Sequence, residues 1–158
     1  MFASQIYFIK DLVKVMSFLY VIKIVDIFFT PTKYYRTNIT KKITDEYDII
    51  TCEKLQIQKM LTNKSLSKKI SDASFYEIIR QLEYKSKFKG KLFYQIDLYY
   101  PSSQECSVCS SIDKNYKDIS KREYDCHKCH HHMDRDLNAS INVMYEGLKL
   151  YLQEKLKI

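Results

Sequence analysis

Two Cys-x-x-Cys motifs, separated by sixteen residues, constrain this chain more than any other feature. The four cysteines are Cys106, Cys109, Cys126 and Cys129. Each short motif can bend into a knuckle that offers two sulfurs, and the ribbon between them can bring the two knuckles together around one tetrahedral zinc ion. Four protein ligands close a zinc site. We therefore expect this metal to be structural and not to activate water.

Histidines beside the second motif leave an alternative ligand set open. They are His127, His130, His131 and His132. One of them could replace a cysteine and give a Cys-three-His site, although the four-cysteine arrangement needs no such replacement. Basic residues around the motifs, such as Lys128, would help to keep the thiolates deprotonated.

Length and charge limit the class of protein. With 158 residues, the chain has room for one domain, or for a modest core plus a small metal-stapled module. Lys and Arg exceed Asp and Glu by seven, and residues 30–100 hold most of the excess with fourteen basic and eight acidic side chains. Such an excess fits nucleic acid, an acidic membrane surface or an ordinary soluble protein.

Cysteine usage and hydropathy predict the compartment. Four of the five cysteines stand at knuckle spacing, which favours a cytoplasmic zinc protein over a secreted disulfide scaffold. The N-terminal region is apolar but interrupted by charges, and its longest uncharged stretch is residues 15–22. A membrane span needs roughly 20 apolar residues, so we expect a soluble intracellular protein.

The first half of the chain mixes helix and strand signals. Apolar spacing predicts a helix over residues 6–18, and a β-branched, aromatic run predicts a buried strand over residues 20–29. A short helix is expected over residues 35–47. Residues 47–52 then have the length and β-branching of a central strand that ends in Glu53.

The second half has clearer signals. A helix is predicted from a capping box at Ser74 and Glu77 to Gly90, followed by a strand over residues 92–99. After the second knuckle, apolar residues recur every three or four positions and predict an amphipathic helix to the C-terminus. Its apolar stripe needs a sheet or another helix to cover it.

Several side chains outside the cysteine motifs have both a functional and an ordinary interpretation. Cys52 is expected to pack as a small hydrophobic residue. Glu53 stands at a strand end, a common place for catalytic carboxylates, but also where a solvated Glu can open a loop. Asp134 and Asp136 lie at the start of the last helix, where Asp also serves as a cap. A cluster of lysines could contact phosphates or complement a helix dipole: Lys85, Lys87, Lys89 and Lys91.

Several motifs in a fixed order carry a resemblance to a known family. They read YDIITCEKL at 47–55, ISDASF at 70–75, EYKSK at 83–87, YYPSSQECSVC at 99–109, YDCHKC at 124–129 and DRDLNASIN at 134–142. In this order they resemble the C-terminal end of TnpB proteins. These are transposon-encoded RNA-guided DNA endonucleases related to type V CRISPR effector nucleases.

The resemblance implies a fold and a site. The fold is a partial RuvC-like nuclease domain of the RNase H type, an α/β or α+β domain, with a zinc ribbon inserted before its last acidic motif. Three carboxylates of the family hold magnesium ions during phosphodiester cleavage. Glu53 matches the second acidic position and Asp136 the third, with Asp134 as the less favoured alternative.

The implied division of the chain has four parts. An N-terminal segment of uncertain origin covers residues 1–34, and the partial nuclease domain covers residues 35–100. The zinc ribbon follows at residues 101–132. Residues 133–158 hold the third acidic motif and the C-terminal helix.

The chain also departs from the family pattern. A Gly, which tolerates positive φ, usually follows each Cys-x-x-Cys, whereas Ser110 and His130 stand there in this sequence. The first acidic motif, a strand ending in Asp, is not recognisable. Asp26 is the one candidate, and it leaves too few residues before Glu53 for the elements that normally lie between the two motifs.

These observations lead us to expect a truncated or decayed TnpB-like protein that binds DNA and guide RNA. As a magnesium-dependent endonuclease it would be inactive or incomplete. One alternative is a non-enzymatic zinc-ribbon module that binds nucleic acid. Another is a nuclease half that a separately encoded N-terminal fragment completes in trans.

Overall fold

The computed structural model describes residues 15–17, 33–54, 75–118 and 120–156. In these ranges the elements follow in the order β1 (Val15–Ser17), α3 (Lys33–Glu46), β2 (Ile49–Glu53), α6 (Phe75–Phe88), β3 (Leu92–Ile96), the 3-10 helix η2 (Lys114–Lys117), β4 (Glu123–Asp125), β5 (His132–Asp134) and α7 (Arg135–Leu156). This mixture of helices and strands confirms the predicted fold class.

The main sheet is parallel and has β2 at its centre, between β1 and β3. In β2, Ile49 pairs with Val15 of β1 on one side and with Leu92 of β3 on the other. The first four residues of β2 are buried, as expected for a parallel strand covered on both faces. The predicted central strand is therefore confirmed, although it begins two residues later than expected.

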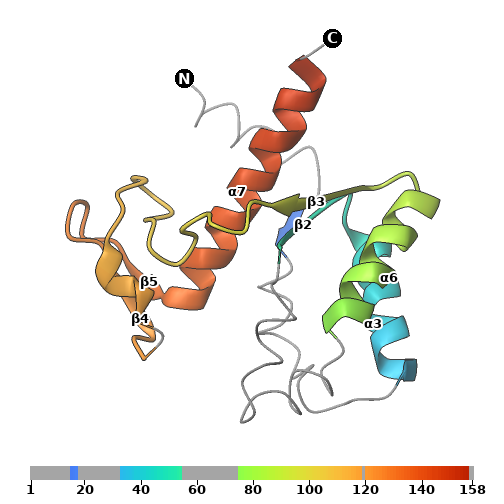
Figure 1. The fold of residues 1–158 in the computed structure, drawn as a ribbon, viewed down its shortest axis with the longest axis horizontal. Helices are drawn as coiled ribbons and strands as arrows, with labels where there is room; N and C mark the ends of the chain where they lie inside the picture. Colours follow the sequence, from blue (N-terminus) through green and yellow to red (C-terminus); the bar gives the residue numbers. More distant parts are fainter. Residues whose placement is uncertain (1–14, 18–32, 55–74, 119, 157–158) are drawn as a thin grey trace.

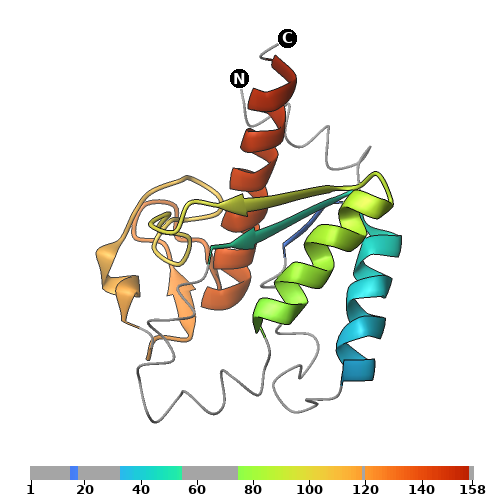
Figure 2. The same ribbon diagram turned by 45° about the vertical axis from the view of Figure 1, so that its right-hand side comes forward.

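Helices cover both faces of this sheet (Figures 1 and 2). Because side chains alternate along a strand, Ile50 and Cys52 face α3 and α6, whereas Ile49 faces α7. Cys52 is only 1% exposed and belongs to the cluster on the α3–α6 side, which confirms its predicted packing. On the other face, α7 buries Leu148 against β2 and β3, so the sheet covers the predicted apolar stripe.

Helix α6 ends where the sequence predicts. Gly90 adopts a φ of 64°, which is readily available only to glycine. The Gly90 amide donates to the Lys87 carbonyl at 3.2 Å, and the Lys91 amide donates to the Ser86 carbonyl at 2.8 Å. These two bonds form a Schellman motif that turns the chain from α6 into β3. The start of the predicted capping box, Ser74, lies outside the described residues.

Two sequence-based boundaries are wrong. Residues 15–17, the end of the predicted helix over 6–18, form strand β1 because their backbone groups pair with the edge of β2. Strand β3 stops at Ile96 because the Asp97 carboxylate accepts a hydrogen bond from the Tyr99 amide at 2.7 Å and starts a turn. The predicted strand over 20–29, with Asp26, lies outside the described residues.

The cysteine-rich ribbon is a separate small unit on the opposite side of α7 from α3 and α6 (Figures 1 and 2). Its β4 and β5 pair antiparallel, and β5 leads directly into α7. This direct connection places the first turn of α7 beside the ribbon. None of the helices in the described ranges is long and apolar enough to span a membrane.

Candidate metal centre and acidic site

The four cysteine sulfurs of the ribbon converge at one point. Their Sγ atoms all lie within 4.8 Å of one another, and in the described ranges they form the one group of three or more possible metal ligands. Cys106 Sγ is 3.7 Å from Cys129 Sγ, and Cys109 Sγ is 3.5 Å from Cys126 Sγ. Tetrahedral zinc with bonds of about 2.3 Å requires sulfurs about 3.8 Å apart, so the cluster fits this ion.

Both knuckles use the same backbone hydrogen bonds. In the first, the Cys106 amide donates to the Ser111 carbonyl and the Ser110 amide donates to the Cys106 carbonyl, both at 2.9 Å. The second knuckle repeats both bonds, also at 2.9 Å, with Cys126, His131 and His130 in the equivalent places. The two halves of the site are therefore built alike, as the repeated Cys-x-x-Cys motif predicts.

The residue after each motif is held in the left-handed region. Ser110 and His130 both have a φ of 56°, at the positions where the family usually has glycine. The conformational demand predicted from the sequence is therefore present. A residue with a side chain pays about 1–2 kcal/mol for this conformation, a cost that the hydrogen bonds of the knuckles and a bound metal would offset.

Ser111 contributes to the thiolate environment. Its Oγ lies 3.2 Å from the sulfurs of both Cys109 and Cys126. The Ser111 hydroxyl lowers the pKa of Cys109. Burial raises the pKa of Cys126, but Ser111 and nearby backbone amides outweigh burial and lower that pKa to about 5. Thiolates are the form that binds zinc, and these hydrogen bonds favour this form at Cys109 and Cys126, whereas burial raises the pKa of Cys106.

The neighbouring histidines lie outside the sulfur cluster. The rings of His127 and His132 are each 60% exposed. His132 Nδ1 lies 2.6 Å from Asp125 Oδ1 across the β4–β5 pair, and this carboxylate raises the pKa of His132. Because four sulfurs already surround one point, the Cys-four set fits better than the Cys-three-His alternative.

Two asparagines on α7 attach the ribbon to the helix. Asn138 donates to the Glu105 carbonyl at 2.7 Å and accepts from the Ser107 amide at 2.9 Å. It is therefore bonded to the residues immediately before and after Cys106. One turn later, Asn142 donates to the Glu105 carbonyl at 2.6 Å. Both asparagines are at most 2% exposed. Their spacing of four residues on an apolar helix is the signal in the sequence that corresponds to this role.

The two aspartates before and within α7 have different environments. Asp134 Oδ1 accepts a hydrogen bond from the Leu137 amide at 2.9 Å, as an N-cap residue does. Asp136 lies in the first turn of α7, its side chain is 46% exposed, and Oδ1 is 3.5 Å from Arg135. Asp134 therefore stabilises the helix start, whereas Asp136 presents its carboxylate to solvent.

Glu53 lies at the carboxyl end of β2, as predicted. Ser102 donates its hydroxyl to Glu53 Oε1 at 2.5 Å, and the Ser102 carbonyl accepts from Asn142 at 2.8 Å. One serine thus joins the end of the central strand to α7, the helix that carries Asp136. Ser102 lies within the YYPSSQ motif, but nothing in the motif predicts its contact with Glu53.

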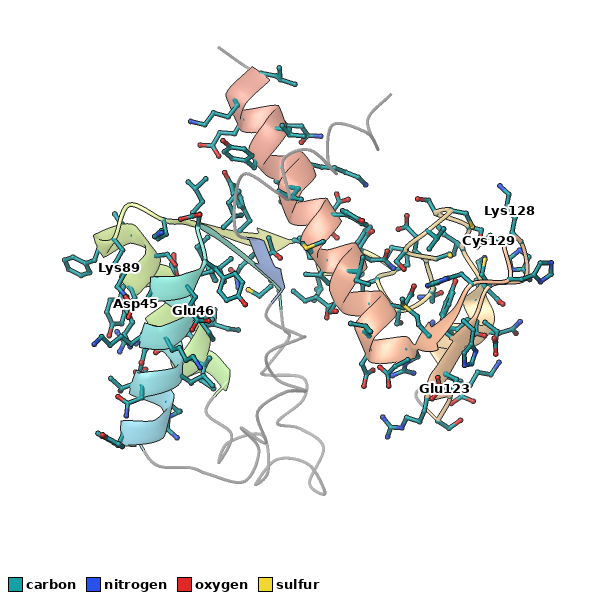
Figure 3. All side chains as sticks on the ribbon, turned by 180° about the vertical axis from the view of Figure 1, so that it is seen from behind. Asp45, Glu46, Lys89, Glu123, Lys128 and Cys129 are labelled. Atoms are coloured by element: carbon teal, nitrogen blue, oxygen red, sulfur yellow. The ribbon has the colours of Figure 1, made fainter. Side chains whose placement is uncertain are left out.

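Three of the four lysines in the predicted patch have partners within the chain. Lys85 Nζ donates to Thr40 Oγ1 at 2.7 Å between α6 and α3. Lys89 forms an ion pair with Asp45 at 2.6 Å, and the two residues lie beside each other in Figure 3. Lys91 forms an ion pair with Asp48, and in the described part of the chain the Lys87 side chain has no such partner.

The comparisons with known proteins point to one family. Residues 75–143 match the family model described as Cas12f1-like, TNB domain. Over 110 residues, 70% of this chain, it is 32% identical to a Streptomyces pristinaespiralis protein named "Putative RNA-guided DNA endonuclease", of which it covers 27%. Over 124 residues, 74% of this chain, it is 26% identical to TnpB-like protein L79 of Acanthamoeba polyphaga mimivirus, of which it covers 23%.

A solved structure shares the fold. It is the cryo-EM structure of a complex of Cas12f1 with sgRNA and target DNA, with a TM-score of 0.55 and 20% identity over 71% of this chain and 33% of the solved chain. The chain spans about a quarter of the length of the curated relatives described above. Together these findings confirm the resemblance to TnpB-type proteins that the motifs predict.

Proposed function

We propose that this relative of TnpB-type endonucleases binds nucleic acid and carries two of the three carboxylates of a magnesium site, Glu53 and Asp136. The observation that carries the proposal is the Ser102 hydrogen bond to Glu53, because the same serine is bonded to α7 through Asn142. Nucleic acid as partner is supported by the names of the relatives and by the basic excess of residues 30–100.

The chemistry of the two side chains fits magnesium, which prefers carboxylate oxygens and keeps several of its waters. When bound at such a site, magnesium would activate water and stabilise the leaving oxygen of a phosphodiester. Glu53 would supply a ligand oxygen from the end of β2, and Ser102 would hold that carboxylate in one orientation. Asp136 would supply a second ligand from the first turn of α7.

Strand β1 does not supply the third carboxylate of the magnesium site. Strand β1 lies parallel to β2, beside the strand that ends in Glu53, and residues 15–17 include no acidic residue. In the family, the first acidic motif is a strand ending in Asp. We therefore infer that the chain alone binds magnesium poorly and cleaves little or no DNA, as expected of a truncated or decayed nuclease or of one completed in trans by an N-terminal fragment.

The zinc ribbon has a structural role in this proposal. Its four cysteines would fill the coordination sphere and leave no position for water or substrate. The bound ion would hold Glu105 and Ser107 in the positions where they form hydrogen bonds with Asn138. These bonds would keep the ribbon against the start of α7. Zinc would thereby help to place Asp136.

Cleavage and binding assays on the zinc-loaded chain test this proposal. We expect binding to DNA or RNA that weakens with added salt, and no magnesium-dependent cleavage beyond that of Glu53→Gln or Asp136→Asn. Cleavage that appears only with the N-terminal region of a relative, and disappears in both variants, would select completion in trans. Efficient cleavage by the isolated chain would contradict an incomplete site, and absence of binding at low salt would contradict the function as a whole.

A non-enzymatic binding module is the second candidate, favoured by the lack of a carboxylate in β1. The two candidates differ in their response to mutation. For a binding module, Glu53→Gln and Asp136→Asn leave nucleic-acid affinity unchanged, with or without magnesium. For a nuclease half completed in trans, the same substitutions abolish cleavage.

A further inference from the structure

The outward side of α6 carries a row of aromatic and basic side chains. Tyr76, Arg80, Tyr84 and Phe88 follow one another at intervals of four residues, so each lies beside the next and the four form one ridge along the helix surface. Tyr76 is 68% exposed and Phe88 is 86% exposed. The row extends over about 18 Å of helix. Large exposed aromatic side chains in a row are unusual on a protein surface and indicate an interaction site.

Contacts within the row hold Arg80, Tyr84 and Phe88 in place. Glu77 binds the Arg80 guanidinium through two hydrogen bonds of 2.8 and 2.9 Å, and the guanidinium lies over the Tyr84 ring at 5.3 Å. The rings of Tyr84 and Phe88 meet edge to face at 6.2 Å. A row that is already ordered loses little conformational entropy when a ligand binds.

Lys87 adds a positive charge to the same face. It lies three residues after Tyr84 and is exposed. The other three lysines of the predicted patch point their ammonium groups at partners on or beside α3. Lys87 forms no ion pair or hydrogen bond in the described part of the chain. Glu83 and Glu154 line the same surface pocket, but neither holds its ammonium group, which can therefore reach a ligand.

The net positive charge of α3, α6 and the residues beside them favours a polyanion as ligand. Residues 33–48 and 75–91, which include α3, α6 and the acidic partners of their lysines, contain nine basic and five acidic side chains. Two copies of this chain meeting through this face would bring like charges together, whereas a phosphate backbone is complementary to it. Aromatic rings combined with a nearby cation are the means by which proteins bind single strands without reading their sequence.

We propose that the outward face of α6 binds single-stranded nucleic acid, with bases stacked on Tyr76 and Phe88 and a phosphate contacted by Lys87. This inference rests on the proposed function and adds to it the surface and the form of nucleic acid. It also replaces the four-lysine patch with one lysine and a row of rings. Lys85 and Lys89 instead hold α3 against α6 and the turn that follows it, and Lys91 pairs with Asp48 at the start of the sheet.

A fluorescence titration tests the inference directly, because the chain contains no tryptophan. In Phe88→Trp, the new indole reports on this one position. Adding a single-stranded oligothymidylate should quench its fluorescence, since a base stacks on the ring. Tyr99→Trp is the matched control, because Tyr99 is 82% exposed but lies outside α6, and its fluorescence should stay nearly constant.

Affinity measurements complete the test. Phe88→Ala should weaken binding about tenfold, whereas Tyr99→Ala should bind like the unmodified protein. Lys87→Ala should weaken binding and reduce the slope of log K against log salt by about 0.7. These residues are exposed, so an unchanged circular dichroism spectrum in each variant would show that the fold is retained.

Three results would overturn the inference, and each has a different meaning. If the unmodified chain binds and Phe88→Ala binds equally well, the surface is wrong while the proposed function stands. If the unmodified chain binds no nucleic acid, the proposed function fails as well. If sedimentation shows a dimer that Phe88→Ala abolishes, the face is a contact between copies of this chain.

Discussion

Ser102 holds the carboxylate of Glu53 through a hydrogen bond of 2.5 Å, although 48 residues separate the two in the sequence. The bond joins the end of the central strand to the loop that opens the cysteine-rich ribbon. The same loop is attached to α7 through its carbonyl groups and Asn142. Strand, ribbon and helix therefore meet at one serine, which is only 7% exposed.

Replacing Ser102 with Ala should lower the free energy of unfolding by about 1–2 kcal/mol, because the Glu53 carboxylate loses a charge-assisted hydrogen bond. Urea unfolding followed by circular dichroism would measure the change. Ser103→Ala is the matched control, since this neighbouring serine lies in the same loop, and it should leave stability nearly unchanged. Equal stability of the two variants would show that the bond to Glu53 contributes nothing.

The contact between α7 and β2 depends on a glycine. A Cβ atom at Gly147 would overlap Thr51 Cγ2 and lie 2.8 Å from Thr51 Cβ, which is itself fully buried. Gly147→Ala should therefore destabilise the protein by about 2 kcal/mol, as other overpacked cores do. In the double variant with Thr51→Ala, thermal unfolding should recover part of this loss. Additive effects of the two substitutions would contradict the close approach of helix and strand.

The two knuckle residues with positive φ offer a stabilising change. Ser110→Gly and His130→Gly should each raise the stability of the zinc-loaded protein by roughly 0.5–1 kcal/mol, because glycine adopts this conformation without the Cβ penalty. Differential scanning calorimetry would detect the gain. Ser107→Gly, at a position of the first knuckle without positive φ, should lose stability instead. A loss of stability at Ser110 and His130 would contradict the left-handed conformation.

Local patterns in the sequence predicted much of this fold. The Cys-x-x-Cys pairs, the β-branched run that forms β2 and the apolar spacing of α7 each depend on residues close in sequence. The role of Asp134 as the N-cap of α7 also depends on residues close in sequence, so the sequence predicts it. Gly90 likewise marked the end of α6.

Other features depend on residues that meet only after folding. Strand β1 forms because the edge of β2 is available, and residues 15–17 show no strand pattern of their own. The bond between Ser102 and Glu53 joins distant segments, as does the ion pair between Lys89 and Asp45. Hydrophobic periodicity contains no information about such polar contacts.

Cysteine reactivity should separate the five thiols. Burial raises the pKa of Cys52 to about 12, so this residue stays protonated and unreactive between pH 7 and 9. With zinc bound, alkylation should be slow at all five positions. After chelation, mass spectrometry should find four alkyl groups on the ribbon and none on Cys52 until denaturant is added. Early modification of Cys52 would contradict its place in the core.

The zinc content of the purified chain tests the central claim most directly. Native mass spectrometry should find one zinc ion per chain, and the same ion in Cys52→Ser, whose cysteine lies away from the ribbon. The double variant Cys106→Ser with Cys126→Ser removes a thiolate from each knuckle and should lose the metal, together with the fold of the ribbon. A chain without zinc, or a double variant that still holds one ion, would contradict the account.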